Sequence, residues 1–303
     1  MADVTGSTSP PSPLPTGVEE LQDRFRDHAY LADRGLATAL FIALSLERPI
    51  LLEGAAGVGK TEVAKVLAAV LGARLIRLQC YEGIDASQAL YEWDYARQLL
   101  YIRSLDAGER AGGTEVFDDV FSPRFLQERP LLEALRATEP VVLLIDEVDR
   151  ADDEFEAFLL EVLSDFQVSI PEIGTVRAER PPPVILTSNR TRELHDALKR
   201  RCVYHWLSYP DPERELEILR ARAPEVPIDL SRQVVSAIAR IREMQLAKAP
   251  GVAETIDWAY AIRLLGLDEL SVEGVLGTLG TVLKDEEDLE RVRANLEVVL
   301  DGT

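Results

Sequence analysis

Cysteine is scarce in this chain of 303 residues, where only Cys80 and Cys202 occur. Each stands beside an apolar segment with the pattern of a strand, and the sequence contains no cysteine or histidine spacing typical of a metal site. The pattern predicts two buried free thiols, because isolated cysteines usually pack as small apolar side chains. This cysteine usage agrees with a reducing compartment and excludes a zinc-binding module.

Long apolar runs are also missing. The longest candidate, residues 36–46, is bounded by charge and is shorter than the roughly 18 residues that a membrane span needs. Residues 1–17 are rich in Pro, Ser and Thr but lack the basic and apolar regions of a signal peptide. We therefore expect a soluble, cytoplasmic protein with no membrane span, in which residues 1–17 form a disordered tail.

Basic residues are in deficit, with 33 Lys and Arg against 53 Asp and Glu and a formal net charge of -20. This charge opposes the long-range attraction of nucleic acid and disfavours nucleic acid as a partner, although a local basic pore would be compatible with it. The acidic balance can equally serve solubility alone.

The sequence does contain a phosphate-binding pattern, G-x-x-x-x-G-K-[ST], between the apolar run at residues 49–52 and a helical stretch at 62–71. In such a loop the backbone N–H groups and the positive end of the following helix converge on phosphate oxygens. Lys60 is expected to hold the β- and γ-phosphates of a nucleotide, and Thr61 a Mg²⁺ ion. The predicted nucleotide-binding residues here are Gly54, Ala55, Ala56, Gly57, Val58, Gly59, Lys60, Thr61 and Glu62.

A second motif follows the aliphatic run at residues 141–145, which is typical of a strand buried on both faces of a parallel sheet. The run ends in Asp146 and Glu147, and carboxylates at this end of a parallel strand face the ligand crevice. We expect Asp146 to reach Mg²⁺, usually through water, and Glu147 to orient or deprotonate the attacking water.

Strand-like segments alternate with helical patterns through the first two thirds of the chain, and helical patterns follow alone. The predicted fold is α/β: a doubly wound, five-stranded parallel P-loop sheet with helices on both faces over residues 18–207, then an all-helical lid domain over 208–303. The strands are expected at residues 49–52, 74–79, 141–145, 184–187 and 203–206. The later helices are expected at residues 213–222, 230–247, 256–265, 272–283 and 286–300.

Two segments interrupt this alternation and are candidates for function-specific surface. Residues 168–183 alternate like a β-hairpin that turns near Gly174. Residues 80–121 hold a glycine-rich stretch at 107–114 and many of the aromatic residues, which either pack in the core or form a partner-binding surface. These aromatic residues are Tyr81, Tyr91, Trp93, Tyr95 and Tyr101.

The chain resembles the AAA+ ATPases from about residue 18 to its end. The resemblance rests on the two nucleotide motifs, on Thr187, Ser188 and Asn189 after a fourth strand, and on the all-helical region that follows them. The resemblance implies that ATP and Mg²⁺ are the cofactors and that Asn189 positions the hydrolytic water together with the acidic residue of the second motif. It further implies an arginine that reaches the γ-phosphate of a neighbouring subunit, with Arg201 aligning best and Arg200 as the alternative. By resemblance the adenine would lie near Tyr30, Leu31 and Ala32.

Within that family the chain resembles the MoxR-type ATPases, and most closely their CoxD-like branch. This resemblance rests on the hairpin and on residues 77–83, 91–95 and 187–194. The resemblance implies a hexameric, chaperone-like remodelling ATPase that acts with a von Willebrand A domain protein on a client metalloenzyme, such as a molybdenum-containing carbon monoxide dehydrogenase. Many relatives place a nucleotide-sensing arginine early in the third lid helix, which this chain lacks. Arg263 or Arg240 would then sense nucleotide, or the lid would couple through other contacts such as Trp258.

Three functions therefore compete. The first is an ATP-hydrolysing ring that remodels or matures its client, and the second is a nucleotide-dependent binding switch whose slow hydrolysis resets the complex. The third, a DNA or RNA motor, is disfavoured by the net charge.

Overall fold

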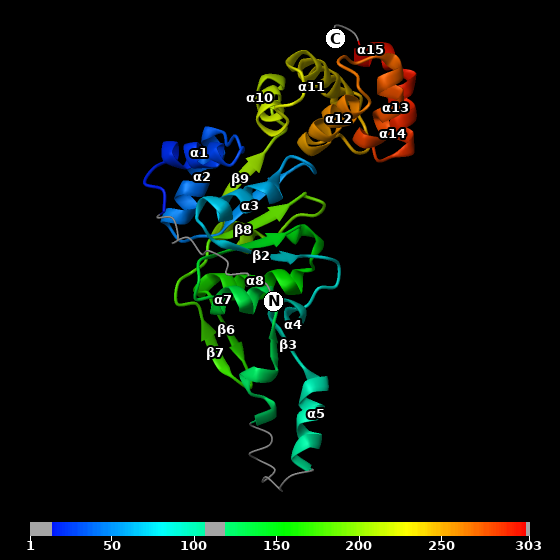
Figure 1. Ribbon diagram of the computed structural model, residues 1–303. Helices are drawn as coiled ribbons and strands as arrows, with labels where there is room; N and C mark the ends of the chain where they lie inside the picture. Colours follow the sequence, from blue (N-terminus) through cyan, green and yellow to red (C-terminus); the bar gives the residue numbers. More distant parts are fainter. Residues whose placement is uncertain (1–13, 107–118, 301–303) are drawn as a thin grey trace, which may run out of the picture. The chain divides into compact units, whose positions relative to one another are not determined.

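A five-stranded parallel sheet is the centre of the fold (Figure 1), in a computed structural model that describes residues 14–106 and 119–300. The strands lie in the order β2-β5-β8-β1-β9, so β1 and β2 are neighbours in sequence but not in the sheet. This order, with β1 inside the sheet and strands on both sides of it, confirms the predicted doubly wound sheet. β1, β5 and β8 at its centre are buried along their whole length, as strands covered on both faces are. The strands are β1 Ile50–Gly54, β2 Arg74–Gln79, β5 Val141–Asp146, β8 Val184–Ser188 and β9 Val203–Leu207.

Helices cover both faces of this sheet. Leu131, Leu132 and Phe155, from α7 and α8, share one buried apolar cluster with residues of β2, β5 and β8. Helices α2 and α3 lie on the other face (Figure 1). Leu40 of α2 and Leu67 of α3 line a pocket there with the first residues of β1 and β8. In chain order up to β9, the helices of the described residues are α1 Val18–Asp27, α2 Arg34–Ser45, α3 Lys60–Val70, α4 Ala86–Leu90, α5 Tyr95–Asp106, α7 Pro130–Arg136, α8 Asp153–Asp165 and α9 Asp196–Arg201, with 3-10 turns η1 Pro123–Phe125 and η2 Val148–Arg150.

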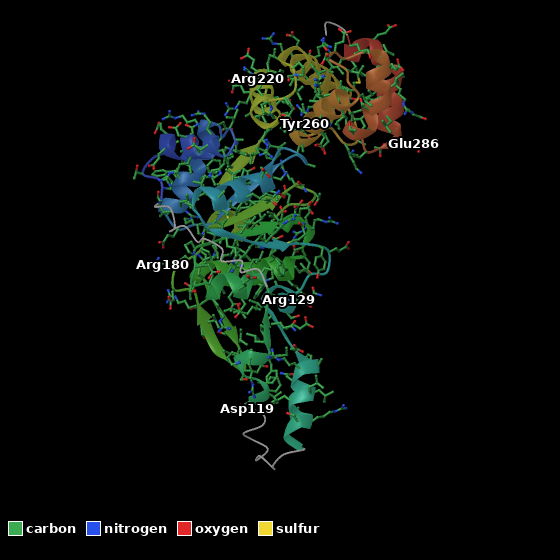
Figure 2. All side chains as sticks on the ribbon, viewed as in Figure 1. Asp119, Arg129, Arg180, Arg220, Tyr260 and Glu286 are labelled. Carbon is green, nitrogen blue, oxygen red and sulfur yellow. The ribbon has the colours of Figure 1, made fainter. Side chains whose placement is uncertain are left out.

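The predicted hairpin is confirmed as an antiparallel pair, β6 Gln167–Ile170 and β7 Gly174–Arg177. Gly174 opens β7 with a φ of 90°, a backbone conformation that glycine adopts without a steric penalty. A second antiparallel pair, which the sequence did not predict, joins β3 Tyr91–Trp93 to β4 Leu126–Glu128. Arg129, labelled in Figure 2, forms an ion pair with Glu92 beside it.

The aromatic residues of the first insertion differ in burial. Trp93 is only 6% exposed and meets Tyr91 and Phe121 edge-on, so it belongs to the core. Tyr95, by contrast, is 67% exposed, and Tyr81 is 45% exposed. The glycine-rich stretch at residues 107–114 lies outside the described residues.

The C-terminal part of the described chain is helical, with Trp258 fully buried in its apolar core. Its helices are α10 Pro212–Arg222, α11 Ile228–Glu243, α12 Val252–Leu264, α13 Val272–Val282, α14 Glu286–Ala294 and α15 Leu296–Leu300. The prediction of one continuous helix over residues 286–300 is wrong. Asn295 caps α14 in a non-helical conformation and its side-chain amide donates to the Arg291 carbonyl, a local bond that competes with helix continuation.

The chain divides into two compact units. One holds the sheet and its helices, from Arg34–Glu53 and Ala64–His205 with the segment up to Leu21. The other joins the helical part from Trp206 onward to Gln22–Asp33 and Gly54–Val63, so the phosphate-binding pattern belongs with the C-terminal helices. The division into domains at residues 207 and 208 stays a prediction.

Cys80 and Cys202 are buried and unpaired, which confirms the prediction for them. Burial raises the pKa of each thiol to about 12, so both stay protonated and unreactive at neutral pH. Among the helices that the structure describes, none has both the length and the apolar character required to cross a membrane.

Candidate functional site

The phosphate-binding loop joins β1 to α3, as the pattern requires. Gly57 and Gly59 have φ values of 78° and 95°, so the loop uses glycine where another side chain would strain the backbone. Lys60, the first residue of α3, is only 7% exposed, and its Nζ donates to the carbonyl oxygens of Gly54 at 2.8 Å and Ala55 at 2.7 Å. The ammonium group is therefore held within the loop, at the positive end of an 11-residue helix.

Residues beside and within the C-terminal helices donate hydrogen bonds to carbonyl groups of this loop, a contact that the sequence did not predict. The hydroxyl of Tyr209 donates to the Ala56 carbonyl at 3.0 Å, and the Val252 N–H donates to the Gly57 carbonyl at 3.1 Å. At Gly251 a Cβ atom would lie 2.4 Å from the carbonyl oxygen of Gly57 and 2.5 Å from its Cα. Only glycine fits there, because the nearest atoms are backbone atoms that no rotamer change can move.

We predict that Gly251→Ala weakens nucleotide binding by about tenfold or more and destabilises the fold by about 1 to 3 kcal/mol, the usual cost of an overpacked contact. Calorimetric titration with ADP and thermal unfolding measure the two effects. Gly280→Ala is the matched control: its added Cβ meets nothing within 4 Å on α13, and alanine favours helix by about 0.5 to 1 kcal/mol. Equal ADP affinity in both variants would contradict the prediction.

Asp146 ends β5 with its side chain only 3% exposed. Arg77 of β2 approaches the same carboxylate, with Nε at 3.0 Å and Nη2 at 2.6 Å from Oδ2, and the Thr187 hydroxyl donates to Oδ1. The parallel register Gln79↔Asp146 brings the ends of β2 and β5 together and explains this ion pair. Asp146 thus holds a fixed orientation at the carboxyl edge of the sheet, where ligands bind in such folds.

Glu147 lies next to Asp146 in a left-handed backbone conformation, with a φ of 54°. Its N–H donates to the Thr187 hydroxyl at 2.9 Å, and its carboxylate accepts from the side-chain amides of Gln79 at 3.0 Å and Asn189 at 3.4 Å. Such a conformation is uncommon for residues other than glycine and concentrates at functional sites. The structure therefore brings Glu147 and Asn189 together.

Asp149 is a further acidic residue that motif reasoning missed. It is 2% exposed and accepts from the N–H groups of Asn189 at 3.2 Å and Thr191 at 2.8 Å. It thereby holds the loop after β8, which carries Asn189, against the turn after β5. Its position three residues after Asp146 was the available signal, but an acidic residue in a turn is too common to be informative.

Arg200 and Arg201 end α9, and both are exposed. Arg48 donates to their two backbone carbonyls, at 2.7 Å and 3.1 Å, and so caps the helix. The Arg201 guanidinium makes one long hydrogen bond, 3.4 Å, to the Leu160 carbonyl. The Arg200 guanidinium makes no hydrogen bond or ion pair with the residues that the structure describes, so both remain candidates for an arginine that acts on a neighbouring subunit.

The segment expected near the adenine, Tyr30, Leu31 and Ala32, belongs to the same unit as the phosphate loop. Arg214 of α10 and Gln22 of α1 both donate to the Ala32 carbonyl, at 3.3 Å and 3.1 Å. Burial, together with nearby Asp33 and Glu62, raises the pKa of Tyr30, so its hydroxyl remains protonated. Glu62 also forms an ion pair with Arg222, at 3.0 Å.

Each of the three candidate lid sensors forms an ion pair or a hydrogen bond within the helical part. Arg263 pairs with Asp268 at 2.6 Å, Arg240 donates to the Val299 carbonyl at 2.8 Å, and the Trp258 indole donates to Thr278 at 2.7 Å. Trp258 is 0% exposed in the core of the helices, so it acts there as a packing residue.

The chain is similar to several known proteins. The sequence profile described as "AAA domain (dynein-related subfamily)" matches residues 49–202. An uncharacterised protein of Staphylococcus haemolyticus, SH1500, is 25% identical over 86% of this chain and 93% of its own length. Protein NorQ of Paracoccus denitrificans is 25% identical over 72% of this chain and 74% of its own length.

Solved structures are more distant in sequence. The RuvB Holliday junction branch migration motor of Thermotoga maritima is 18% identical, with a TM-score of 0.48 over 95% of this chain and 79% of that one. A protein of Cytophaga hutchinsonii described as a candidate ATPase is 17% identical, with a TM-score of 0.46 over 94% of each chain.

Proposed function

Because the chain belongs to the AAA domains of the dynein-related subfamily, we propose that it is an AAA+ ATPase that binds ATP with Mg²⁺ and hydrolyses it to ADP and phosphate. The observation that carries this proposal is the pairing of Glu147 with Asn189 at the end of β5, in a chain whose phosphate loop encloses Lys60. Neither feature is needed for a folded sheet. The loop with Lys60 supplies phosphate binding and charge stabilisation, and Glu147 with Asn189 supplies groups that can orient a water, which are the functions that phosphoryl transfer requires.

In the proposed reaction the N–H groups of the loop and the ammonium of Lys60 bind the phosphates. Glu147 accepts a proton from the attacking water, and the Asn189 amide orients the carboxylate, the water or both. Thr61 and Asp146 provide hard oxygen donors of the kind that Mg²⁺ prefers. The metal, when bound, neutralises charge on the phosphates.

A nucleotide-dependent binding switch with slow hydrolysis is the second candidate, and one specific observation favours it. Arg77 of β2 binds Asp146, and Gln79 of the same strand donates to Glu147. These contacts would have to break before the two carboxylates could bind a metal ion or a water, which would slow hydrolysis. A plot of specific ATPase activity against protein concentration separates the candidates. A ring that needs an arginine from its neighbour loses specific activity on dilution, whereas a monomeric switch keeps a constant slow rate.

We predict that Arg77→Ala lowers the Mg²⁺ concentration required for half-maximal ATP hydrolysis by about three- to tenfold, because a cation that competes for Asp146 is removed. The guanidinium is 52% exposed, so its interaction with the carboxylate is worth only about 1 kcal/mol. Titration of Mg²⁺ into the ADP-bound protein provides a second readout that does not depend on turnover. Arg74→Ala is the control, since Arg74 of the same strand pairs with Glu133 and Glu139 instead. An unchanged or raised Mg²⁺ requirement would contradict the prediction.

The finer assignment rests on resemblance. Residues 77–83, 91–95 and 187–194 support a MoxR-type, CoxD-like ATPase, which would form a hexamer and act as a chaperone. It would work with a von Willebrand A domain protein on a client metalloenzyme, such as a molybdenum-containing carbon monoxide dehydrogenase. Co-purification of the tagged chain from cells that express each candidate partner, with ATP or ADP present, tests this assignment. Recovery of neither partner in either nucleotide state would reject it.

A further inference from the structure

A buried ion pair joins two helices of the unit that contains the phosphate loop. Arg242 of α11 binds Glu215 of α10 through two contacts, Nη1 to Oε2 at 2.6 Å and Nη2 to Oε1 at 2.8 Å. Their side chains are only 12% and 1% exposed. A buried ion pair contributes little net stability compared with apolar side chains of similar volume, so what this pair provides is the geometry that it imposes on its neighbours.

Two series of contacts lead from this ion pair to the phosphate loop. In the first, the Arg242 guanidinium lies over the ring of Tyr209, 4.5 Å from its centre, and the Tyr209 hydroxyl donates to the Ala56 carbonyl at 3.0 Å. Burial raises the pKa of Tyr209, so this hydroxyl stays protonated and able to donate. Its other acceptor, the Ala249 carbonyl, is more distant at 3.4 Å.

The second series of contacts passes through the turn before α12. Arg242 Nε donates to the Pro250 carbonyl at 2.8 Å, which fixes the start of that turn. The Thr255 hydroxyl, which donates to Glu215 at 2.6 Å, lies 3.1 Å from the Gly251 carbonyl and ties the turn to the same carboxylate. The Val252 N–H then donates to the Gly57 carbonyl at 3.1 Å.

Both series of contacts end on carbonyl groups of the phosphate loop, and this determines where the N–H groups of the loop point. A trans peptide is planar, with its C=O and N–H directed oppositely. A donor that fixes the Ala56 carbonyl therefore also fixes the N–H of Gly57, and a donor on the Gly57 carbonyl fixes the N–H of Val58. These N–H groups belong to the glycine-rich stretch that binds phosphate oxygens in such loops.

We propose that Tyr209, Arg242 and Glu215 are positioning residues that preset the phosphate loop, aiming the N–H groups of Gly57 and Val58 at the phosphates of a bound nucleoside di- or triphosphate. The inference rests on the proposed function only in taking a nucleotide as the ligand. Because binding free energies are reciprocal, bound nucleotide in turn stabilises the packing of α10, α11 and α12. The network thus couples the phosphate loop to the helices without a dedicated sensor arginine in α12.

The test measures ADP affinity by calorimetric titration of the full chain, with unfolding temperature as a second readout. Tyr209→Phe keeps the ring and its contact with Arg242 but removes one hydrogen bond, so we expect ADP to bind about three- to tenfold more weakly. Removing both charges, with Arg242→Met and Glu215→Leu together, avoids leaving an unpaired buried charge and should weaken binding by about tenfold or more. In that background Tyr209→Phe should have almost no added effect, since coupled contacts are not additive.

Tyr260→Phe is the matched control. Its hydroxyl, on a residue labelled in Figure 2, donates to the Arg222 carbonyl in the same unit and does not contact the loop. We expect this control to bind ADP as the wild type does. In the Tyr209 and charge-removing variants the KM for ATP should rise more than kcat falls, because a preset loop acts on binding.

Wild-type affinity for ADP in both Tyr209→Phe and the folded charge-removing variant would overturn the inference and leave the proposed function intact. A lower unfolding temperature without any change in ADP affinity would overturn it as well, since the ion pair would then be only structural. Failure of the wild type to bind ADP or ATP would instead overturn the proposed function, and this inference with it.

Discussion

Glu147→Gln is expected to lower the rate of ATP hydrolysis by about 10²- to 10⁴-fold, the usual contribution of a positioned general base. The amide has the shape of the carboxylate but cannot accept a proton from water. Gln79 and Asn189 donate to different oxygens of the Glu147 carboxylate, so one of these two hydrogen bonds can persist to the single amide oxygen of the variant. Nucleotide affinity should therefore remain close to that of the wild type, and the variant should accumulate bound ATP.

Single-turnover hydrolysis and ADP titration, carried out side by side, separate these two effects. Glu154→Gln is the control, because it makes the same chemical change at an exposed position of α8. If Glu147→Gln turned over ATP at the wild-type rate, another group would be the base. If it lost nucleotide binding as well as hydrolysis, the substitution would have disturbed the site and not the proton transfer alone.

Arg201→Ala is expected to reduce ATP hydrolysis by about 10³-fold or more, and activity should return when excess Glu147→Gln subunits are added. An arginine supplied by a neighbouring subunit is worth about 10³ to 10⁵ in rate in related reactions. Within the described part of the chain, the Arg201 guanidinium makes one hydrogen bond, which at 3.4 Å is weak enough to be exchanged for a phosphate contact. The Glu147→Gln subunit cannot hydrolyse ATP itself but would provide the missing guanidinium.

A dilution series of wild type, Arg201→Ala, Arg200→Ala and the mixtures identifies which arginine acts. Lys199→Ala removes a neighbouring charge from α9 and is the control for a general loss of basic character. Rescue of Arg200→Ala, with full activity of Arg201→Ala, would transfer the role to Arg200. Normal hydrolysis by both variants at every dilution would reject the ring and favour the monomeric switch.

The sequence predicted well those parts of the molecule that local patterns encode. β1, β5 and β8 consist mostly of β-branched or aliphatic residues, whereas β2 and β9 mix such residues with charged, polar or aromatic ones. The predicted positions of all five strands agree with the observed strands to within two residues at each end. The phosphate loop and the acidic end of β5 are contiguous motifs, so the type and order of their residues predict their chemistry. Asn189 was found in the same way, because its place after a fourth strand resembles the family pattern.

Local patterns were less informative where short elements depend on partners distant in sequence. The pair formed by β3 and β4 has only three residues in each strand, too few for an alternating pattern. The break at Asn295 depends on one side chain bonding to the backbone, which helical periodicity does not report. The different burial of Trp93 and Tyr95 likewise depends on packing, which the identity of two nearby aromatic residues does not reveal.

The sequence by itself determined the sheet, the phosphate loop and the identity of the acidic residues, since each depends on neighbours along the chain. Only the tertiary structure decided what surrounds them. It placed Arg77 on Asp146 across 69 positions of sequence and Tyr209 on Ala56 across 153. It also made Gly251 necessary, through a contact with the backbone of Gly57. Such contacts follow from how strands and helices pack, and no spacing rule relates the residues that meet there.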